Sequence, residues 1–89
     1  MKIVFHRDFE KEYKKLTEKV KLKVKEKNLL FVVDPYNPSL NNHSLHGKYM
    51  GYRSFNITGD VRIVYKLLNN NTALFAEIGT HSKLYSQYI

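Results

Sequence analysis

The first third of the chain carries apolar residues at helical spacing. The residues that repeat three or four positions apart are Phe9, Tyr13, Leu16 and Val20. This spacing predicts a helix with one apolar face, and Asp8 is its expected N-cap. Thr17 is also suited to capping, so we expect the helix to break there into a helical hairpin.

Residues 19–27, "KVKLKVKEK", fit two patterns. Their alternation is typical of a strand, yet lysine and glutamate favour helices and are poor strand formers. Val24 also continues the apolar face that runs through Val20. We therefore predict a second helix, which the apolar residues 29–33 extend. Residues 34–42, "DPYNPSLNN", predict a loop because they combine two prolines with three asparagines.

The remainder of the chain has the short alternating runs of strands. In residues 52–57, "YRSFNI", Arg53 and Phe55 fall on one face and the intervening side chains on the other. The "TGD" at 58–60 predicts a hairpin turn in which Gly59 is free to take a positive φ. We therefore predict one strand before this turn and a second strand after it.

Two further runs, residues 61–68 and 72–78, complete a three-stranded antiparallel meander. Thr80 or Ser82 is suited to cap a short C-terminal helix or tail. Residues 2–6, "KIVFH", predict a strand that joins the edge of the sheet. The expected fold class is α+β, with an N-terminal strand and a helical hairpin packed on a small antiparallel sheet.

The composition is that of one small domain spanning residues 1–89. Because the chain has no cysteine, it forms no disulfide and no thiolate site, which fits a reducing cytoplasm. No apolar run approaches the roughly 18 residues of a membrane span. The charged start "MKIVFHRDFEKEYKK" does not resemble a signal peptide. We expect a cytoplasmic protein without a membrane partner.

The net charge of +7 is unevenly distributed. Residues 1–27 hold ten Lys/Arg against five Asp/Glu, whereas residues 28–89 hold five against three. A basic surface is often simply solvated, but a polyanionic partner such as nucleic acid also explains it. If nucleic acid is bound, we expect the lysines that attract it and the residues that react with it to lie on different segments.

His43 and His46 lie three residues apart near the start of the meander. A metal site needs three or four ligands and no carboxylate pair lies nearby, so we expect no metal. A general acid or base needs only one imidazole, whose ordinary pKa of about 6.5 lies near neutrality. The alternative is a turn histidine bonded to the backbone. No Walker or Rossmann glycine pattern is present, and we expect no cofactor.

Arg53 and Arg62 are suited to grip phosphate, because a guanidinium offers a planar fork of donors. For Arg53 an ion pair with Asp60 or Glu77 is the alternative. Asp60, at the end of the turn, either caps its own backbone or orients a catalytic group. His81 follows "AEIGT", an abrupt turn that presents a ring over the sheet edge, unless this segment serves only to cap the next helix.

Two segments, "NNHSLHGKYMGYRSFNITGDVRIVYK" and "ALFAEIGTHSKLY", together resemble the RelE/ParE superfamily of bacterial toxins. They are most similar to its YafQ and RelE/StbE branch. That branch carries His-x-Leu-x-Gly-x-x-x-Gly-Tyr-Arg, then an Asp-containing hairpin, then Gly-Thr-His-x-x-Leu-Phe/Tyr. The resemblance covers residues 42–85, about half of the chain. The ordered combination is more specific than any one segment.

The resemblance implies a ribonuclease that cleaves mRNA, typically on the ribosome, and is neutralised by a cognate acidic antitoxin. By position, His43, Asp60 and His81 match active-site residues of the family. We expect the two histidines to act as an acid–base pair, in an order that stays open, with Asp60 orienting one of them. The RNA 2′-OH is the nucleophile in such a site, so no metal is required.

The residues that we expect to bind substrate are Arg53, Arg62, Tyr85, His46 and Lys48. Tyr85 matches an aromatic position of the family, and a tyrosine ring can stack on a base or pack against the sheet. The lysines of residues 1–27 are expected to contact ribosomal RNA with a steep salt dependence.

Asn56 departs from the family, because YafQ-like toxins have a catalytic histidine at this position. Asparagine forms hydrogen bonds but takes no proton. Two alternatives therefore remain beside the ribonuclease. A ParE-like toxin acting on DNA gyrase would leave His81 unexplained. A catalytically weakened toxin that still binds its antitoxin, itself expected to be acidic and partly disordered, is favoured by Asn56.

Overall fold

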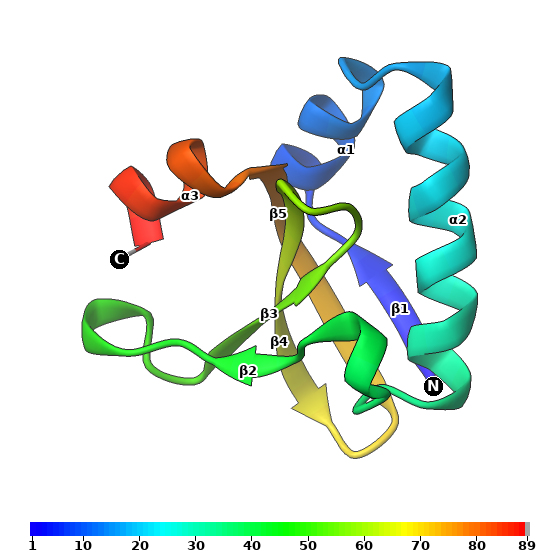
Figure 1. Cartoon of the computed structure of the whole chain (residues 1–89). Helices are drawn as coiled ribbons and strands as arrows, with labels where there is room; N and C mark the ends of the chain where they lie inside the picture. Colours follow the sequence, from blue (N-terminus) through cyan, green and yellow to red (C-terminus); the bar gives the residue numbers. More distant parts are fainter. Residues whose placement is uncertain (89) are drawn as a thin grey trace.

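The computed structural model describes residues 1–88, leaving aside the side chains of Lys48 and of residues 85–88. Its centre is a five-stranded sheet in the order β1-β5-β4-β3-β2 (Figure 1). The strands are β1 (Lys2–Phe5), β2 (His43–Ser44), β3 (Tyr52–Asn56), β4 (Val61–Asn69) and β5 (Thr72–Thr80). The helices are α1 (Arg7–Lys14), α2 (Glu18–Val33) and α3 (His81–Tyr88), with short 3-10 helices η1 (Pro38–Leu40) and η2 (Gly47–Tyr49). The predicted α+β class is confirmed.

β1 lies at one edge of the sheet, as predicted, and pairs in parallel with β5. The meander of β3, β4 and β5 is antiparallel, and β2 adds a short antiparallel edge to β3. The sheet is therefore mixed rather than wholly antiparallel. A hairpin turn does not set the direction of β1, because β1 and its partner β5 lie near opposite ends of the chain. A register shift after Val64 marks a bulge, which allows both Phe75 and Ile78 to face the core.

The helical hairpin of α1 and α2 is confirmed, and residues 19–27 are helical. Thr17 caps α2 as predicted, since its hydroxyl accepts from the Val20 backbone N–H. The prediction for α1 was wrong by two residues. Its N-cap is His6, whose Nδ1 accepts from the backbone N–H of Asp8, so Asp8 lies inside the first turn where its charge favours the helix dipole. No helix in the described part of the chain combines the length and apolar character needed to cross a membrane.

The main core lies between the helical hairpin and one face of the sheet. Phe31 of α2 is fully buried, with its ring 4.8 Å from that of Phe55 on β3 and 5.5 Å from that of Phe75 on β5. Phe9 of α1 joins the same cluster, which confirms the apolar face expected for this helix. Each such ring contributes about 1.5–3 kcal/mol by burial, so these contacts fix how the hairpin sits on the sheet.

The opposite face of the sheet is covered only in part. Figure 1 shows α3 on the side of the sheet away from α1 and α2. Leu84 of α3 packs there against Leu45 and Val64 in a second, smaller buried cluster. Thr80 caps this helix, as one of the two predicted caps, because its hydroxyl accepts from the Lys83 backbone N–H. We call this whole side of the sheet, including the part that α3 covers, the open face.

The turn between β3 and β4 is built differently from the prediction. Gly59 does not have a positive φ; the glycines that do are Gly47 and Gly51. Thr58 shapes the turn instead, since its hydroxyl accepts from the backbone N–H groups of Asp60 and Val61. A threonine hydroxyl that bonds ahead in this way supplies the turn without left-handed backbone.

Candidate active site

Side chains from three neighbouring strands share the open face. His43 on β2 lies directly opposite Ser54, and Asn56, two residues further along β3, lies opposite Arg62 on β4. Arg62 in turn lies opposite Gly79 on β5. Directly opposed residues point to the same side of a sheet, and so do residues two apart in one strand. His43, Asn56 and Arg62 therefore all face the side on which α3 lies.

Asp60 and His81 meet at the end of this face. The backbone N–H of His81 donates to the Asp60 carbonyl over 2.9 Å, and Val61 pairs with Thr80 beside them. Both residues are exposed. The turn between β3 and β4 is thus joined to the start of α3, and the backbone of His81 lies next to that of Asp60. Asn56 and Arg62 thus lie on the open face between the short strand that carries His43 and the turn where Asp60 meets His81.

The ring of His43 has a defined orientation. Its Nδ1 lies 2.9 Å from the carbonyl oxygen of Asn41. A carbonyl only accepts, so Nδ1 carries the proton in this contact and the neutral ring keeps its lone pair on Nε2. The side chain is exposed, so this lone pair is open to a ligand. This tautomer is the one that a general base at Nε2 requires.

Arg53, which we expected to bind substrate, does not share the face of His43. The register of β2 on β3 places Ser44, not His43, opposite Arg53. Arg53 accordingly points to the helix side, where its Nε donates to Asn42 Oδ1 over 2.9 Å and its guanidinium lies 5.3 Å from the Tyr36 ring centre. The alternating sequence pattern predicted that Arg53 and Phe55 lie on the same face of β3. Since Phe55 is in the core beneath the helices, Arg53 points to the helix side as well.

Asn56 and Arg62 form a pair that sequence reasoning missed. Arg62 Nη1 donates to Asn56 Oδ1 over 2.7 Å. Arg62 Nε is buried and has no hydrogen-bond partner among the described residues. Asn56 therefore holds the guanidinium in place while part of its donor capacity is unused. The sequence does contain the information for this pair, because a hairpin turn centred on residues 57–61 places position 56 directly opposite position 62.

The remaining predicted site residues lie at the borders of this region. His46 is exposed at the N-cap of η2, and its side chain makes no capping hydrogen bond there. Lys48 and Tyr85 have side chains outside the described part of the structure, so only their backbone positions in η2 and α3 are known. Among the described residues, no three His, Cys, Asp or Glu side chains are grouped so as to hold a metal.

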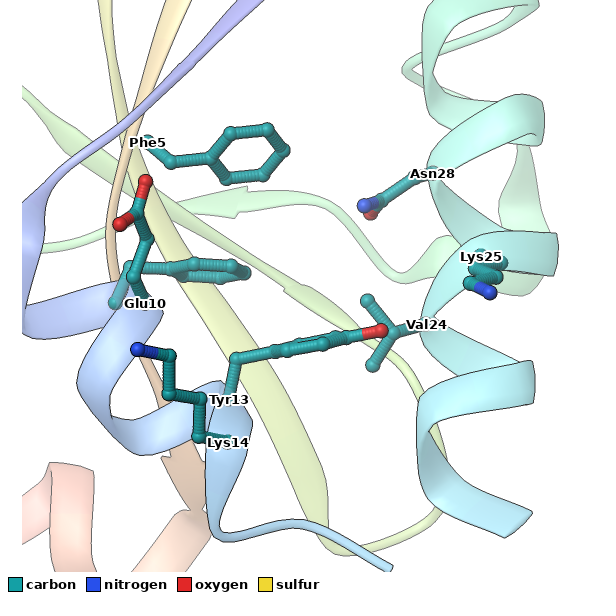
Figure 2. Close-up of a pocket in the computed structure, with 8 residues that line it drawn as sticks. Phe5, Glu10, Tyr13, Lys14, Val24, Lys25 and Asn28 are labelled. Carbon is teal, nitrogen blue, oxygen red and sulfur yellow. The ribbon is translucent and has the colours of Figure 1, made fainter. Parts of the chain in front are cut away.

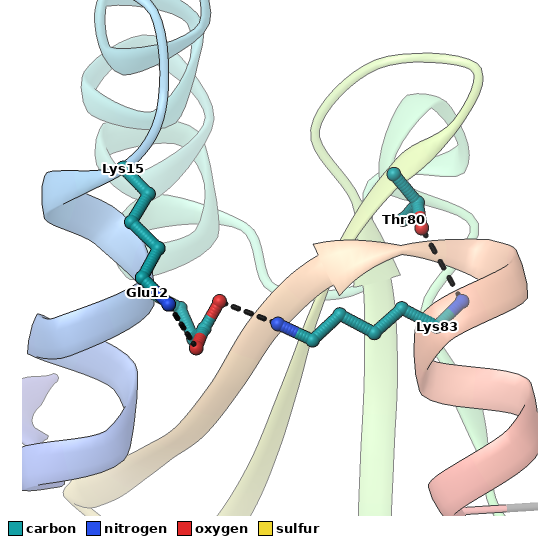
Figure 3. A network of polar contacts seen from close by, with 4 residues as sticks. All are labelled: Glu12, Lys15, Thr80 and Lys83. Atoms are coloured by element: carbon teal, nitrogen blue, oxygen red, sulfur yellow. Dashed lines mark hydrogen bonds and ion pairs between the residues drawn. The ribbon is translucent and has the colours of Figure 1, made fainter.

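A polar bridge attaches the start of α3 to α1. Lys83, two residues after His81, donates from Nζ to the Glu12 carboxylate (Figure 3). Lys15 also donates to Glu12, over 3.4 Å. The hydrogen bond from Lys83 is the main reason that the pKa of Glu12 is lowered; burial opposes this shift, and Lys15 adds a weaker lowering. The bridge ties the helix that carries His81 to the helical hairpin.

The sequence profile of the family described as "Bacterial toxin of type II toxin-antitoxin system, YafQ" matches residues 1–86. A search of curated protein sequences gave no match.

Among solved structures, YafQ from E. coli strain BL21(DE3) superposes with a TM-score of 0.79 at 24% identity, over 93% of this chain and 96% of that one. The toxin of the E. coli DinJ–YafQ complex matches with a TM-score of 0.68 at 26% identity, over 93% and 96%. A YoeB/ParE toxin from Agrobacterium tumefaciens shares the fold, with a TM-score of 0.77 at 20% identity over 91% and 99%. Because the family profile spans nearly the whole chain, this protein belongs to the YafQ family of bacterial toxins of type II toxin–antitoxin systems.

Proposed function

We propose that this toxin is a metal-independent endoribonuclease that cleaves mRNA on the ribosome and so inhibits translation. The observation that carries the proposal is a base-competent histidine and a held guanidinium on one face of the sheet, with a second histidine beside the turn between β3 and β4. These are His43, Arg62 and His81. RNA supplies the nucleophile itself, so the protein has only to move two protons and stabilise charge.

The proposed reaction is an internal displacement at phosphorus. Nε2 of His43 takes the proton of the 2′-OH while O2′ bonds to the phosphorus, and the bond from phosphorus to O5′ breaks. His81 gives a proton to the departing 5′-oxygen. The products are a 2′,3′-cyclic phosphate and a 5′-OH end, and water later restores the two protonation states. Each proton transfer contributes roughly 10²–10⁴ in rate.

Arg62 and Asp60 have supporting roles in this scheme. Arg62 stabilises the charge that develops on the phosphate oxygens, since Asn56 holds the guanidinium on the site face. Asp60 attracts the protonated ring of His81, beside which its backbone is fixed. Position 85 lies one helical turn after His81 in α3, and we assign Tyr85 to stacking on a base. His46 and Lys48 border the site on η2 and are assigned to contacts with the RNA backbone.

The acid–base assignment is tested with synthetic RNA bound to stalled ribosomes and with translation in cells that lack antitoxin. His43→Gln and His81→Gln should each slow cleavage by at least about a hundredfold and restore translation. His6→Asn is the matched control, because His6 is exposed and asparagine also caps a helix. The cleaved RNA should carry a cyclic phosphate end.

Other outcomes would support the alternatives. Unchanged mRNA together with DNA damage would indicate a gyrase inhibitor. Tight antitoxin binding with no arrest of translation, by the wild type, would indicate a weakened toxin. Equal toxicity of wild type, His43→Gln and His81→Gln would exclude the acid–base assignment.

The helical hairpin offers the surface that we assign to the antitoxin. A cavity of about 410 Å³ lies between β1, α1 and α2 (Figure 2). Its floor is apolar, with Phe5, Phe9 and Val24, and lysines 14 and 25 are at its rim. Asn28 Oδ1 is buried here and lacks a hydrogen-bond partner among the described residues. An acidic segment with apolar side chains and an N–H donor fits this chemistry, and the YafQ of E. coli is itself found in complex with DinJ.

The antitoxin surface is tested with the product of a neighbouring small acidic gene. Lys14→Glu with Lys25→Glu should weaken the complex at least tenfold and reduce its salt dependence. Lys19→Glu with Lys23→Glu is the matched control, since both lysines are exposed outside the cavity lining. Both double variants should weaken ribosome binding, because we assign the hairpin lysines to ribosomal RNA as well.

A further inference from the structure

The position of His43 is not fixed by the sheet alone. β2 has only two residues, lies at the sheet edge, and pairs with β3 on one side. The segment before it, residues 34–42, is a loop that contains only the three-residue η1. A catalytic base must be held within hydrogen-bonding reach of the proton it takes. Something other than strand pairing must therefore hold the chain that enters β2.

Asn42, the residue before His43, is held from the helix side of the sheet. Its Nδ2 donates to the Tyr65 hydroxyl over 2.7 Å and to the Pro35 carbonyl over 2.8 Å. Its Oδ1 accepts from Arg53 Nε over 2.9 Å. Both amide hydrogens and the amide oxygen are thus engaged, which aspartate or leucine could not reproduce. We call Asn42, Arg53 and Tyr65 the Asn42 clamp.

The anchors of the clamp are themselves rigid. Tyr65 is 1% exposed, packed edge-on against the rings of Phe31 and Phe55, and its burial raises the pKa of the hydroxyl so that it stays neutral. Arg53 is held on β3 and lies 5.3 Å from the ring centre of Tyr36 in the same loop. The clamp therefore connects the loop to two central strands at once.

The geometry points to a link between this clamp and the ring of His43. Asn41 has a left-handed backbone, with φ of 48°, and its carbonyl is the acceptor for His43 Nδ1. Asn42 lies between the two residues of this hydrogen bond, so holding Asn42 holds both of its ends. We infer that Arg53, Asn42 and Tyr65 are positioning residues that set the place and tautomer of His43 from the opposite face, and that Arg53 does not bind RNA. The inference rests on the proposed role of His43 as base.

The tautomer of His43 tests the inference without any RNA, by ¹⁵N chemical shifts of the full-length toxin at a pH where the ring is neutral. In the wild type the tautomer with hydrogen on Nδ1 should predominate. Tyr65→Phe removes the hydroxyl but keeps the buried ring. Arg53→Lys keeps the positive charge but removes the guanidinium group whose Nε donates to Asn42. Both should shift the ring towards hydrogen on Nε2. Failure of the ribonuclease proposal would leave this measurement unaffected.

Cleavage kinetics provide the second readout. Both variants should lower kcat about tenfold with KM unchanged, a fraction of the roughly 10²–10⁴ that a well-placed base contributes. Ile78→Val is the control, because it weakens the same core without touching Asn42. An unchanged tautomer in Tyr65→Phe, or an equal shift in Ile78→Val, would overturn the inference. A raised KM with unchanged kcat and tautomer in Arg53→Lys would instead show that Arg53 binds phosphate.

Discussion

The two faces of the sheet differ in what they bury and in what they leave exposed. The helix-covered face packs Phe31 against Phe55 and Phe75, and its main polar feature is the Asn42 clamp. The open face has a small apolar cluster around Val64 and carries the polar pair of Asn56 and Arg62. This comparison indicates that the residues that contribute most of the folding free energy and the residues of the proposed reaction lie on opposite faces of the same strands.

The largest expected effect concerns the helix-covered face. Phe31→Ala removes a fully buried ring that contacts three other aromatic rings, and should lower the free energy of unfolding by about 3–5 kcal/mol. That is a large part of the 5–15 kcal/mol typical of a domain. Urea unfolding followed by circular dichroism measures the loss.

Val64→Ala supplies the matching change on the open face. It removes two methyl-sized groups from the smaller cluster, so we expect a loss of about 1–2 kcal/mol. If the two substitutions destabilise the protein equally, the faces do not divide stability as proposed.

The next effect concerns catalysis without loss of fold. Arg62→Gln keeps a hydrogen-bonding group next to Asn56 but removes the positive charge, and should lower kcat for RNA cleavage by roughly 10²–10³. The urea midpoint should change little. Arg7→Gln is the control, since Arg7 is an exposed arginine at the start of α1, away from the site. A large loss of stability in Arg62→Gln, with activity retained, would place Arg62 among the structural residues.

Much of the fold was predictable because its signals are local. The apolar spacing from Phe9 to Val24 predicts the hairpin, and the Thr17 cap divides it. The edge position of β1 also follows from the sequence, but its parallel direction does not, because it depends on a partner some seventy residues away in β5. Asp8 was misassigned as a cap because histidine seldom caps a helix, and here His6 does so.

The geometry of the candidate site was less predictable than the fold. The family resemblance grouped His43, Asp60 and His81; the structure joins the backbones of Asp60 and His81 and places His43 on β2, opposite Ser54. Arg53 was expected to bind substrate, but the register of the two-residue β2 places it on the opposite face from His43. No propensity specifies the register of so short a strand, and a shift of one residue exchanges the faces. The roles of all these residues stay predictions.

A smaller effect concerns Asn56, at the position where the family resemblance predicts a histidine. Asn56→Ala removes the acceptor that holds Arg62, and should lower kcat about tenfold, since a hydrogen bond to a charged group contributes roughly 1.5 kcal/mol. In the Arg62→Gln background the same change should have little further effect. Ser54→Ala, on the same strand and face, is the control. Additive losses in the double variant would mean that Asn56 acts independently of Arg62.

The smallest effect concerns the bridge that joins the two sides of the sheet at one end. Lys83 of α3 holds the pKa of Glu12 on α1 below its ordinary value of 4.5. A carboxyl with a lowered folded-state pKa stabilises the fold above its unfolded-state pKa, and this contribution is lost as pH falls through the lowered value. Glu12→Gln should therefore be slightly less stable than wild type at pH 7, with the difference vanishing in acid.

Urea midpoints of both proteins between pH 7 and pH 3 provide the measurement, with Glu26→Gln as the control because its partner Lys23 lies in the same helix. The difference for Glu12→Gln should also shrink in high salt, since the pair is partly exposed. Cleavage at pH 7 should fall no more than about twofold, because Leu84 still seats α3 on the open face when the bridge is absent. A difference that persists unchanged at pH 3 would show that Glu12 acts through packing and not through its charge.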